Sequence, residues 1–183
     1  MADPAEAVKY NLHFEDATLS GEVTEDEGGK TRFGLASKYN PDLNDENFYA
    51  LPVEEALTKA MQIYTERYCP RVDVTQIVDQ AVANKIYDMF VNMGDEAIFL
   101  VQNCVGADAD GHIGPNTLRQ INSSDPGGLC YRLCNVSRAY YKKVELHSIS
   151  IGKPRSEGEL KSWDTRARCM GKVGDFQPEK AQQ

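Results

Sequence analysis

The chain lacks the features that mark several large classes of protein. No apolar run approaches the roughly 18 residues that span a membrane, so we expect no stable membrane insertion. The start, MADPAEAV, has no basic stretch followed by an apolar one, and we expect no secretory signal. The five cysteines are odd in number and irregularly spaced. This pattern favours reduced thiols and synthesis in a cytoplasm over a disulfide framework.

Motifs for several kinds of chemistry are also missing. There is no Gly-x-Ser-x-Gly elbow and no Walker-type phosphate loop, so serine hydrolase and nucleotide hydrolase functions find no support. Cys130 and Cys134 are four residues apart, but no nearby histidine or second cysteine pair completes a zinc site. Asp108 begins a short stretch similar to a calcium loop, but the twelfth position is Arg119 where a glutamate is required. The sequence therefore indicates no metal and no organic cofactor.

Charge is distributed unevenly along the chain. The net charge is −8, and residues 1–60 alone, with 13 acidic and 5 basic side chains, carry that value. Residues 138–173 have 9 basic and 4 acidic side chains. The acidic balance argues against non-specific binding of nucleic acid. The basic segment is either a set of solvated helix faces or a surface for an anionic partner.

Helical patterns dominate the rest of the sequence, and we predict a mainly α fold. Helix starts and apolar stripes at helical spacing predict helices over residues 4–16, 52–68, 76–93, 95–105, 125–147 and 157–169. The stripe in the third of these comprises Val78, Val82, Ile86, Met89 and Met93. Strand signals are weak, and the polar, glycine-rich stretch 18–35 is the best candidate for a small β-hairpin.

An acidic loop near the N-terminus is the most informative local feature. Residues 25–34 read EDEGGKTRFG, in which three acids precede two glycines. Like charges crowded beside a turn repel one another, which favours protonation of one of them. The alternatives to a functional site are a solvated acidic hairpin and a calcium-binding loop.

The order of residues in this region resembles glycoside hydrolase family 108, the phage and bacterial N-acetylmuramidases. The family pattern is a glutamate that ends the first helix, a short acidic loop, and then Asp-x-Gly-Gly-x-Thr, an aromatic residue and Gly-Ile. Here the pattern is Glu15, the loop DATLSGEVTE, and then Asp26-Glu27-Gly28-Gly29-Lys30-Thr31-Arg32-Phe33-Gly34-Leu35. The chain departs from the pattern because Glu15 is not followed by Gly-Gly, the loop is longer, and Glu27 replaces a common proline.

The second half of the chain resembles the helical peptidoglycan-binding region that usually follows these enzymes. The matching residues are Ile63-Tyr64, Tyr68-Cys69, Tyr87-Asp88, Val91-Asn92-Met93-Gly94, Gln102, Asp110-Gly111-His112-Ile113-Gly114-Pro115-Asn116-Thr117-Leu118, Arg138-Ala139-Tyr140-Tyr141 and Ser162-Trp163-Asp164-Thr165-Arg166. Tyr68 is followed by cysteine where the family has tryptophan. The resemblance covers residues 10–170. It implies a lysozyme-like helical fold, with a muramidase part over residues 1–75, a peptidoglycan-binding part over 76–171 packed against it, and a polar tail over 172–183.

The resemblance also implies an activity and a set of site residues. The reaction is hydrolysis of the β-1,4 bond between N-acetylmuramic acid and N-acetylglucosamine in peptidoglycan. Such a reaction needs one protonated and one charged carboxyl beside the sugar, and the acid needs a raised pKa. We predict Glu15 as the general acid, Asp26 as the second carboxylate with Glu25 and Glu22 as alternatives, and Thr31 as an assisting hydroxyl. The predicted substrate-binding residues are Gly28, Gly29, Phe33, Tyr64, Tyr68 and Asn92.

The sequence leaves the biological setting open. The same helices suit a non-catalytic peptidoglycan-binding or virion structural module, and the same chemistry suits a phage endolysin or a toxin delivered between bacteria. A toxin would have an immunity protein as a partner. We otherwise expect a monomer whose partner is the peptidoglycan glycan strand. It would be made in the cytoplasm of the bacterial host and act on peptidoglycan in the periplasm after release or delivery.

Overall fold

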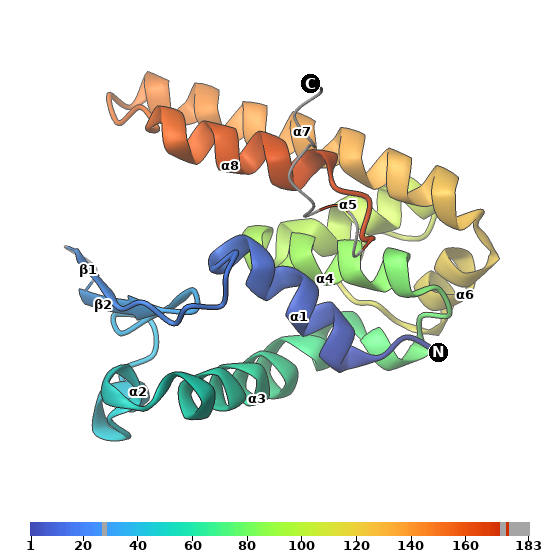
Figure 1. The fold of residues 1–183 in the computed structure, drawn as a ribbon. Coiled ribbons are helices and arrows are strands. Elements are labelled where there is room, and N and C mark those ends of the chain that lie inside the picture. Colours follow the sequence, from blue (N-terminus) through green and yellow to red (C-terminus); the bar gives the residue numbers. More distant parts are fainter. Residues whose placement is uncertain (27–28, 173–174, 176–183) are drawn as a thin grey trace, which may run out of the picture.

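The computed structural model describes residues 1–26, 29–172 and 175, and shows a mainly α protein (Figure 1). Its helices are α1 (Pro4–Glu15), α2 (Asp42–Asp45), α3 (Val53–Val72), α4 (Gln80–Met93), α5 (Asp95–Val105), α6 (Pro115–Ser123), α7 (Pro126–Ser150) and α8 (Glu157–Arg168). Short 3-10 turns are η1 (Phe48–Ala50) and η2 (Val74–Gln76), and the strands are β1 (Thr24–Asp26), β2 (Gly29–Arg32) and β3 (Leu35–Ala36). The mainly α class with a small hairpin near the acidic loop is therefore confirmed.

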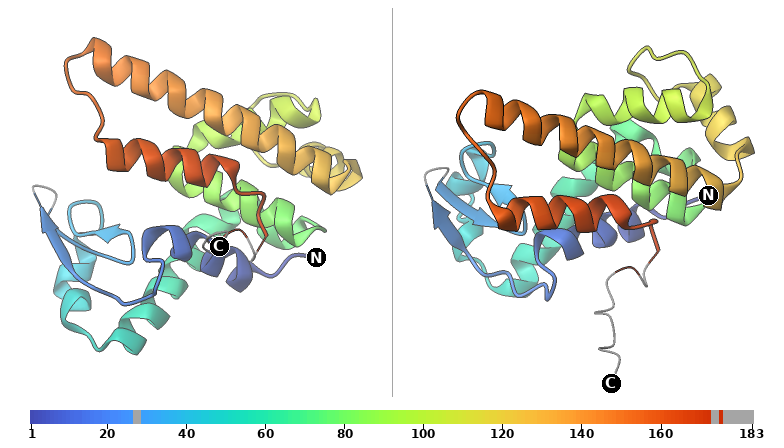
Figure 2. Two further views of the ribbon diagram at one scale, coloured as in Figure 1. Left: turned by 45° about the horizontal axis from the view of Figure 1, so that its top comes forward. Right: turned by 90° about the horizontal axis from the view of Figure 1, so that it is seen from above.

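Helix α4 is the centre of the molecule. Helices α1, α3, α5 and α7 all pack against it, and its stripe of Val82, Ile86, Met89 and Met93 is buried. Helices α7 and α8 form an antiparallel pair along one side, as both views in Figure 2 show. One continuous core joins α1 and α3 to α4, α5 and α7. The predicted muramidase part (residues 1–75) and the predicted peptidoglycan-binding part (residues 76–171) therefore share this core.

Side-chain caps fix where the helices begin. Asp3, Asp79 and Asp125 each accept a hydrogen bond from a backbone N–H in the first turn of the following helix. Ser156 and Glu159 form a reciprocal capping box at the start of α8. These caps satisfy N–H groups that have no partner within the helix. The cap at Asp79 places the start of α4 at residue 80.

The start of α4 corrects one prediction. The apolar pattern placed the helix start at residue 76 and Val78 on the buried stripe. Val78 instead precedes the cap at Asp79 and is 60% exposed. Helix α3 ends at Val72, four residues beyond the predicted end, and it contains Pro70. Helices α2 and α6 were not predicted, because neither has a long apolar stripe.

The hairpin predicted within residues 18–35 is present, with a third strand added. The sheet has the antiparallel order β1-β2-β3. The buried guanidinium of Arg32 fixes this sheet to the neighbouring loop and turn segments. It donates to the carbonyl oxygens of Gly21 (2.8 Å), Leu51 (2.7 Å) and Phe48 (3.2 Å). One side chain therefore joins the loop after α1, the sheet and the segment before α3.

Replacing Arg32 tests this role. Arg32→Met leaves three carbonyl oxygens without their donor, and unmade buried hydrogen bonds are costly. We expect the free energy of unfolding to fall by at least about 2 kcal/mol, measured by urea denaturation. Lys30→Met, on the exposed part of the same strand, is the matched control and should change stability by less than about 0.5 kcal/mol. Equal losses of stability in the two variants would contradict the role of Arg32 in fixing the sheet.

Candidate active site

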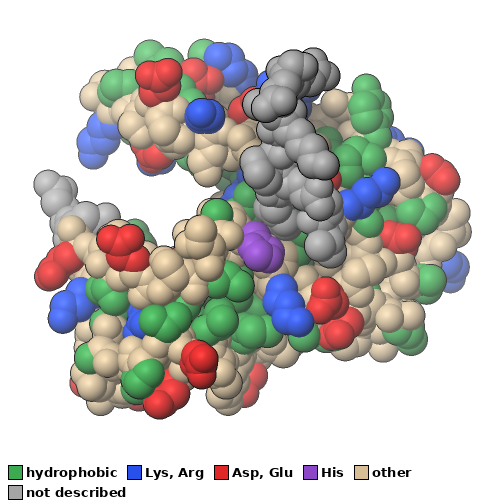
Figure 3. Space-filling model, in the orientation of Figure 1, with side chains coloured by type: hydrophobic (Ala, Val, Ile, Leu, Met, Phe, Trp, Pro, Cys, Tyr) green, Lys and Arg blue, Asp and Glu red, His purple; other side chains and the backbone are tan. Residues whose placement is uncertain are grey.

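Glu15 is the last residue of α1, where that helix meets the sheet. Its carboxyl lies at a cavity of about 200 Å³. The cavity is lined by Glu15, Asp16, Ser20, Glu22, Thr24, Thr31, Phe33 and Gly34. Figure 3 shows that the surface is deeply hollowed between the α7–α8 pair and the sheet. The fold therefore brings Glu15 and Thr31 together at one opening.

Asp16 shapes the loop that follows Glu15. Its carboxylate accepts hydrogen bonds from the backbone N–H of Gly21 (2.7 Å) and from the hydroxyls of Ser20 (3.2 Å) and Thr18 (3.3 Å). Partial burial opposes ionisation, but these hydrogen bonds outweigh it and hold the pKa of Asp16 below its usual value. The carboxylate of Asp16 therefore stabilises the loop after α1, and Glu15 remains at the end of that helix.

Gly34 allows the sheet to approach Glu15 closely. Its φ is +76°, and a Cβ atom there would lie 2.8 Å from both Cγ and Oε2 of Glu15. The same atom would lie 2.7 Å from the hydroxyl oxygen of Tyr64, which donates to the carbonyl of Phe33 at 3.1 Å. No larger residue fits without displacing the carboxyl. The glycine of the Phe-Gly pair is therefore part of the geometry of the site.

A buried arginine from the far end of the chain also contacts Glu15. Nη2 of Arg166 in α8 donates to Oε1 of Glu15 at 2.9 Å, and Nη1 lies 3.3 Å from Oδ1 of Asp88 in α4. Arg166 is 4% exposed and Asp88 is 1% exposed. Burial raises the pKa of Asp88 to about 6; the charges of Arg166 and Lys85 oppose this rise and that of Glu15 adds to it. Nothing in the sequence pattern indicated this contact.

Only some of the predicted substrate-binding residues line the cavity at Glu15. Phe33 lines the cavity, although most of its ring is buried. Tyr64 is only 2% exposed and lies behind Gly34, so its ring is not available to a ligand. Tyr68 packs against Tyr64 with ring centroids 5.4 Å apart. Asn92 is exposed but does not line the cavity, and its amide donates 2.8 Å to the carbonyl of Asp88 in its own helix.

The second carboxylate is not fixed by the described side chains. The backbone of Asp26 pairs with Gly29 across the β1–β2 turn. The side chain of Asp26 and the whole of Gly28 lie outside the described part of the chain. Glu22 lines the same cavity as Glu15, whereas Glu25 is not among the lining residues. Of the two alternatives, Glu22 is the one that shares the opening.

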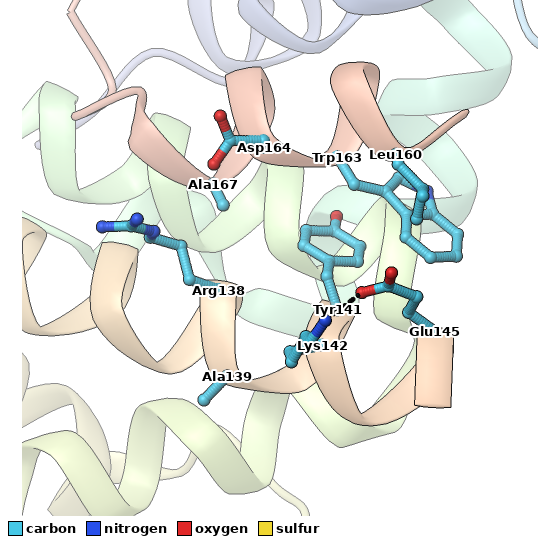
Figure 4. A pocket seen from close by; sticks show the side chains of 9 residues that line it. All are labelled: Arg138, Ala139, Tyr141, Lys142, Glu145, Leu160, Trp163, Asp164 and Ala167. Atoms are coloured by element: carbon cyan, nitrogen blue, oxygen red, sulfur yellow. Dashed lines mark hydrogen bonds and ion pairs between the residues drawn. The ribbon is translucent and has the colours of Figure 1, made fainter. Parts of the chain in front are cut away.

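A larger cavity of about 440 Å³ lies between α7 and α8 (Figure 4). Tyr141 and Trp163 form its aromatic wall, with ring centroids 5.1 Å apart and planes inclined by 16°. Arg138 and Lys142 also line it, and Lys142 pairs with Glu145 at 2.9 Å. Glu145 and Asp164 line it as well, so the cavity combines an aromatic wall with two cationic and two acidic side chains.

The basic side chains of residues 138–173 do not gather on one surface for an anionic partner, which was one of the two alternatives for this segment. Lys142 lines the α7–α8 cavity, while Lys143 lines a separate hollow beside α5. Arg155 lies over the ring of Trp163, and Arg168 pairs with Asp164 at 2.7 Å. Arg166, as described above, is buried. The reason is helical geometry, since neighbouring positions on one helix point in different directions.

The described helices and side chains also bear on membrane insertion and metal binding. None of the described helices is both long and apolar enough to cross a membrane. Within residues 1–26, 29–172 and 175, no group of three or more histidine, cysteine, aspartate or glutamate residues is placed to hold a metal ion. All five cysteines are free thiols.

Comparisons with known proteins support a glycoside hydrolase. Residues 20–94 match the model of the family described as glycosyl hydrolase 108. No curated protein matches the chain. Among solved structures, the chain is similar to "Structure of Brucella abortus SagA", with a TM-score of 0.64 and 22% identity over 92% of this chain and 95% of that chain. The structural similarity shows a shared fold over almost the whole chain. The family match includes Thr31, Phe33 and Gly34 but begins after Glu15.

Gly34→Ala tests the close approach at Glu15. The added methyl group meets both the carboxyl and the Tyr64 hydroxyl, and it also meets the strain of a positive φ. Gly106→Ala is the matched control, because Gly106 has φ +72° and open space around it. We expect Gly106→Ala to cost about 1 kcal/mol and Gly34→Ala to cost clearly more, measured by urea denaturation. A smaller loss for Gly34→Ala would mean that Glu15 moves aside freely.

Proposed function

We propose that the chain is a peptidoglycan hydrolase of the family 108 type. It cleaves the β-1,4 bond between N-acetylmuramic acid and N-acetylglucosamine, and Glu15 is the general acid. The observation that carries this proposal is the cavity in which Glu15 and Thr31 face one opening, within a chain whose residues 20–94 match a glycoside hydrolase family.

The chemistry needs two groups on the two sides of the sugar. A protonated carboxyl donates to the leaving oxygen, while a charged carboxylate stabilises the developing positive centre or activates water. Glu15 has the first role. Asp26 is the proposed second carboxylate, at the tip of β1, with Glu22 and then Glu25 as alternatives. Thr31 would hold the attacking water through its hydroxyl. The proposed catalytic side chains therefore come from the end of α1 and from the hairpin.

Recognition of the glycan would use the hollow around this cavity. Phe33 and Thr31 already line it, and Gly29 lies in β2 next to the hairpin tip. Tyr64 supports this surface from behind, since its hydroxyl holds the backbone of Phe33. Its role is therefore to fix the loop rather than to touch sugar.

Glu15→Gln tests the general acid. The amide cannot donate a proton in the way a carboxylic acid does, so hydrolysis of purified sacculi should fall by roughly 10²–10⁴-fold. Folding should persist, because Arg166 keeps its ion pair with Asp88. Turbidity loss of the sacculi measures the rate. Glu6→Gln, on the same helix and with a side chain that is 43% exposed, is the control and should match the wild type.

A series of substitutions in the hairpin identifies the second carboxylate. Asp26→Asn should abolish most activity, while Glu22→Gln and Glu25→Gln should retain it. If Glu15→Gln lyses sacculi at the wild-type rate and Glu22→Gln or Glu25→Gln is inactive, the assignment of both catalytic carboxyls is wrong. Binding to sacculi without hydrolysis by the unaltered protein would instead favour a non-catalytic binding module.

The α7–α8 cavity is a second proposed contact with the wall. Peptidoglycan carries carboxylates on its peptides, and Arg138 and Lys142 supply cations beside the aromatic wall of Tyr141 and Trp163. Lys142→Gln with Arg138→Gln should weaken sedimentation with sacculi, most strongly at low salt, because exposed charges are screened beyond about 10 Å at 0.1 M.

Lys143→Gln is the matched control for this surface. It adjoins Lys142 in sequence but lies outside the α7–α8 cavity. The control should bind sacculi as the wild type does. If the Arg138 and Lys142 substitutions change neither binding nor its salt dependence, recognition rests on the cavity at Glu15 alone.

A further inference from the structure

Three charged side chains from three helices meet beside the cavity. Glu15 ends α1, Asp88 lies in the middle of α4 and Arg166 lies in α8, 151 residues away from Glu15. The guanidinium lies between the two carboxylates, at 2.9 Å from one and 3.3 Å from the other. The ring of Phe14 covers the guanidinium at 4.6 Å from its centroid. Arg166 therefore has little freedom to move.

Both carboxylates matter because Arg166 is buried. A buried guanidinium without an anionic partner is strongly unfavourable. A general acid must be neutral at the moment it donates its proton, and a neutral Glu15 no longer compensates the charge of Arg166. Asp88 provides the second anion. The cluster can thus hold one proton on a carboxyl while Arg166 stays paired.

We infer that Arg166 and Asp88 are positioning residues for Glu15. Arg166 orients the carboxyl toward the cavity, and Asp88 keeps Arg166 in place while Glu15 carries its proton. This inference rests on the proposed function for its catalytic meaning, but the anchoring itself is a property of the folded chain.

Asp88 and α8 are themselves held from several sides. The amide of Asn92 donates to the backbone carbonyl of Asp88 and lies 3.5 Å from its Oδ1. Nζ of Lys85 donates to the carbonyl oxygens of Arg166 (2.9 Å) and Ala167 (3.4 Å) at the end of α8. These contacts fix both the carboxylate and the backbone that carries the guanidinium.

The arrangement assigns a role to the C-terminal helix pair. Helix α8 packs on α7 and brings Arg166 to the end of α1. Residues 76–171 then contribute more than a wall-binding surface, since they complete the surroundings of the acid. A chain truncated before α8 would keep Glu15, Thr31 and Gly34 but lose the cation that orients Glu15.

The first test separates positioning from binding. Arg166→Met removes the cation but keeps much of its apolar volume, so kcat on a soluble glycan fragment should fall about 10- to 100-fold, the usual effect of a misplaced catalytic group. KM should change little, because Arg166 is buried away from the ligand. Arg166→Lys should recover part of kcat. Arg168→Met is the control on the same helix, since Arg168 is exposed, and should match the wild type.

A double substitution guards against simple unfolding. Arg166→Met alone leaves Asp88 buried and unpaired, whereas Arg166→Met with Asp88→Asn removes both charges. The double variant should regain much of the thermal stability lost in Arg166→Met and still show the low kcat. A stable double variant with wild-type kcat would overturn the positioning role.

The anchoring can be measured without any substrate. NMR of the guanidinium protons reports whether Arg166 stays paired and protected from exchange. In Glu15→Gln, which imitates the neutral acid, the Arg166 signals should remain protected because the guanidinium stays buried in its ion pair with Asp88. In Asp88→Asn they should lose protection. Loss of protection in Glu15→Gln would overturn the role of Asp88. If the wild type fails to hydrolyse sacculi, the proposed function fails while this measurement still decides the anchoring.

Discussion

The ion pair between Arg166 and Glu15 is the contact on which the candidate site depends. It joins the end of α1 to α8 across the central helix, and Asp88 of that helix completes it. The pair is buried on the arginine side and open to the cavity on the glutamate side, where 23% of the side chain is exposed. This asymmetry holds the carboxyl firmly and still leaves it accessible to a ligand.

The small sheet depends on the same region for its placement. Gly34 lies against Glu15, and Arg32 fixes the hairpin to the loop after α1 and to the segment before α3. Because both residues are in or beside β2, the hairpin can present Thr31 only in one register. Two buried cations therefore organise this region: Arg32 holds its backbone, and Arg166 pairs with Glu15.

Much of the fold could be predicted because helices carry local signals. The stripe of Ala56, Ala60, Ile63 and Tyr64 in α3 is buried as its spacing predicts, and α5 has the predicted bounds. Short elements such as α2 lack such stripes. The start of α4 was misplaced because the cap at Asp79, rather than the apolar period, decides it. The motif order predicted Glu15 and Thr31 as site residues, and both line one cavity. The burial of Tyr64 was not predicted.

The sequence by itself determined the helical class, the hairpin in the acidic loop and the likeness to a glycoside hydrolase family. Those properties depend on residues close to one another along the chain. Only the tertiary structure decided which charge faces Glu15. Arg166 lies two residues before the exposed Arg168 in the same helix, and its burial follows from the packing of α8 against the rest of the molecule. An ion pair between residues 151 positions apart leaves no local pattern, because its partners are brought together by the core and not by their neighbours.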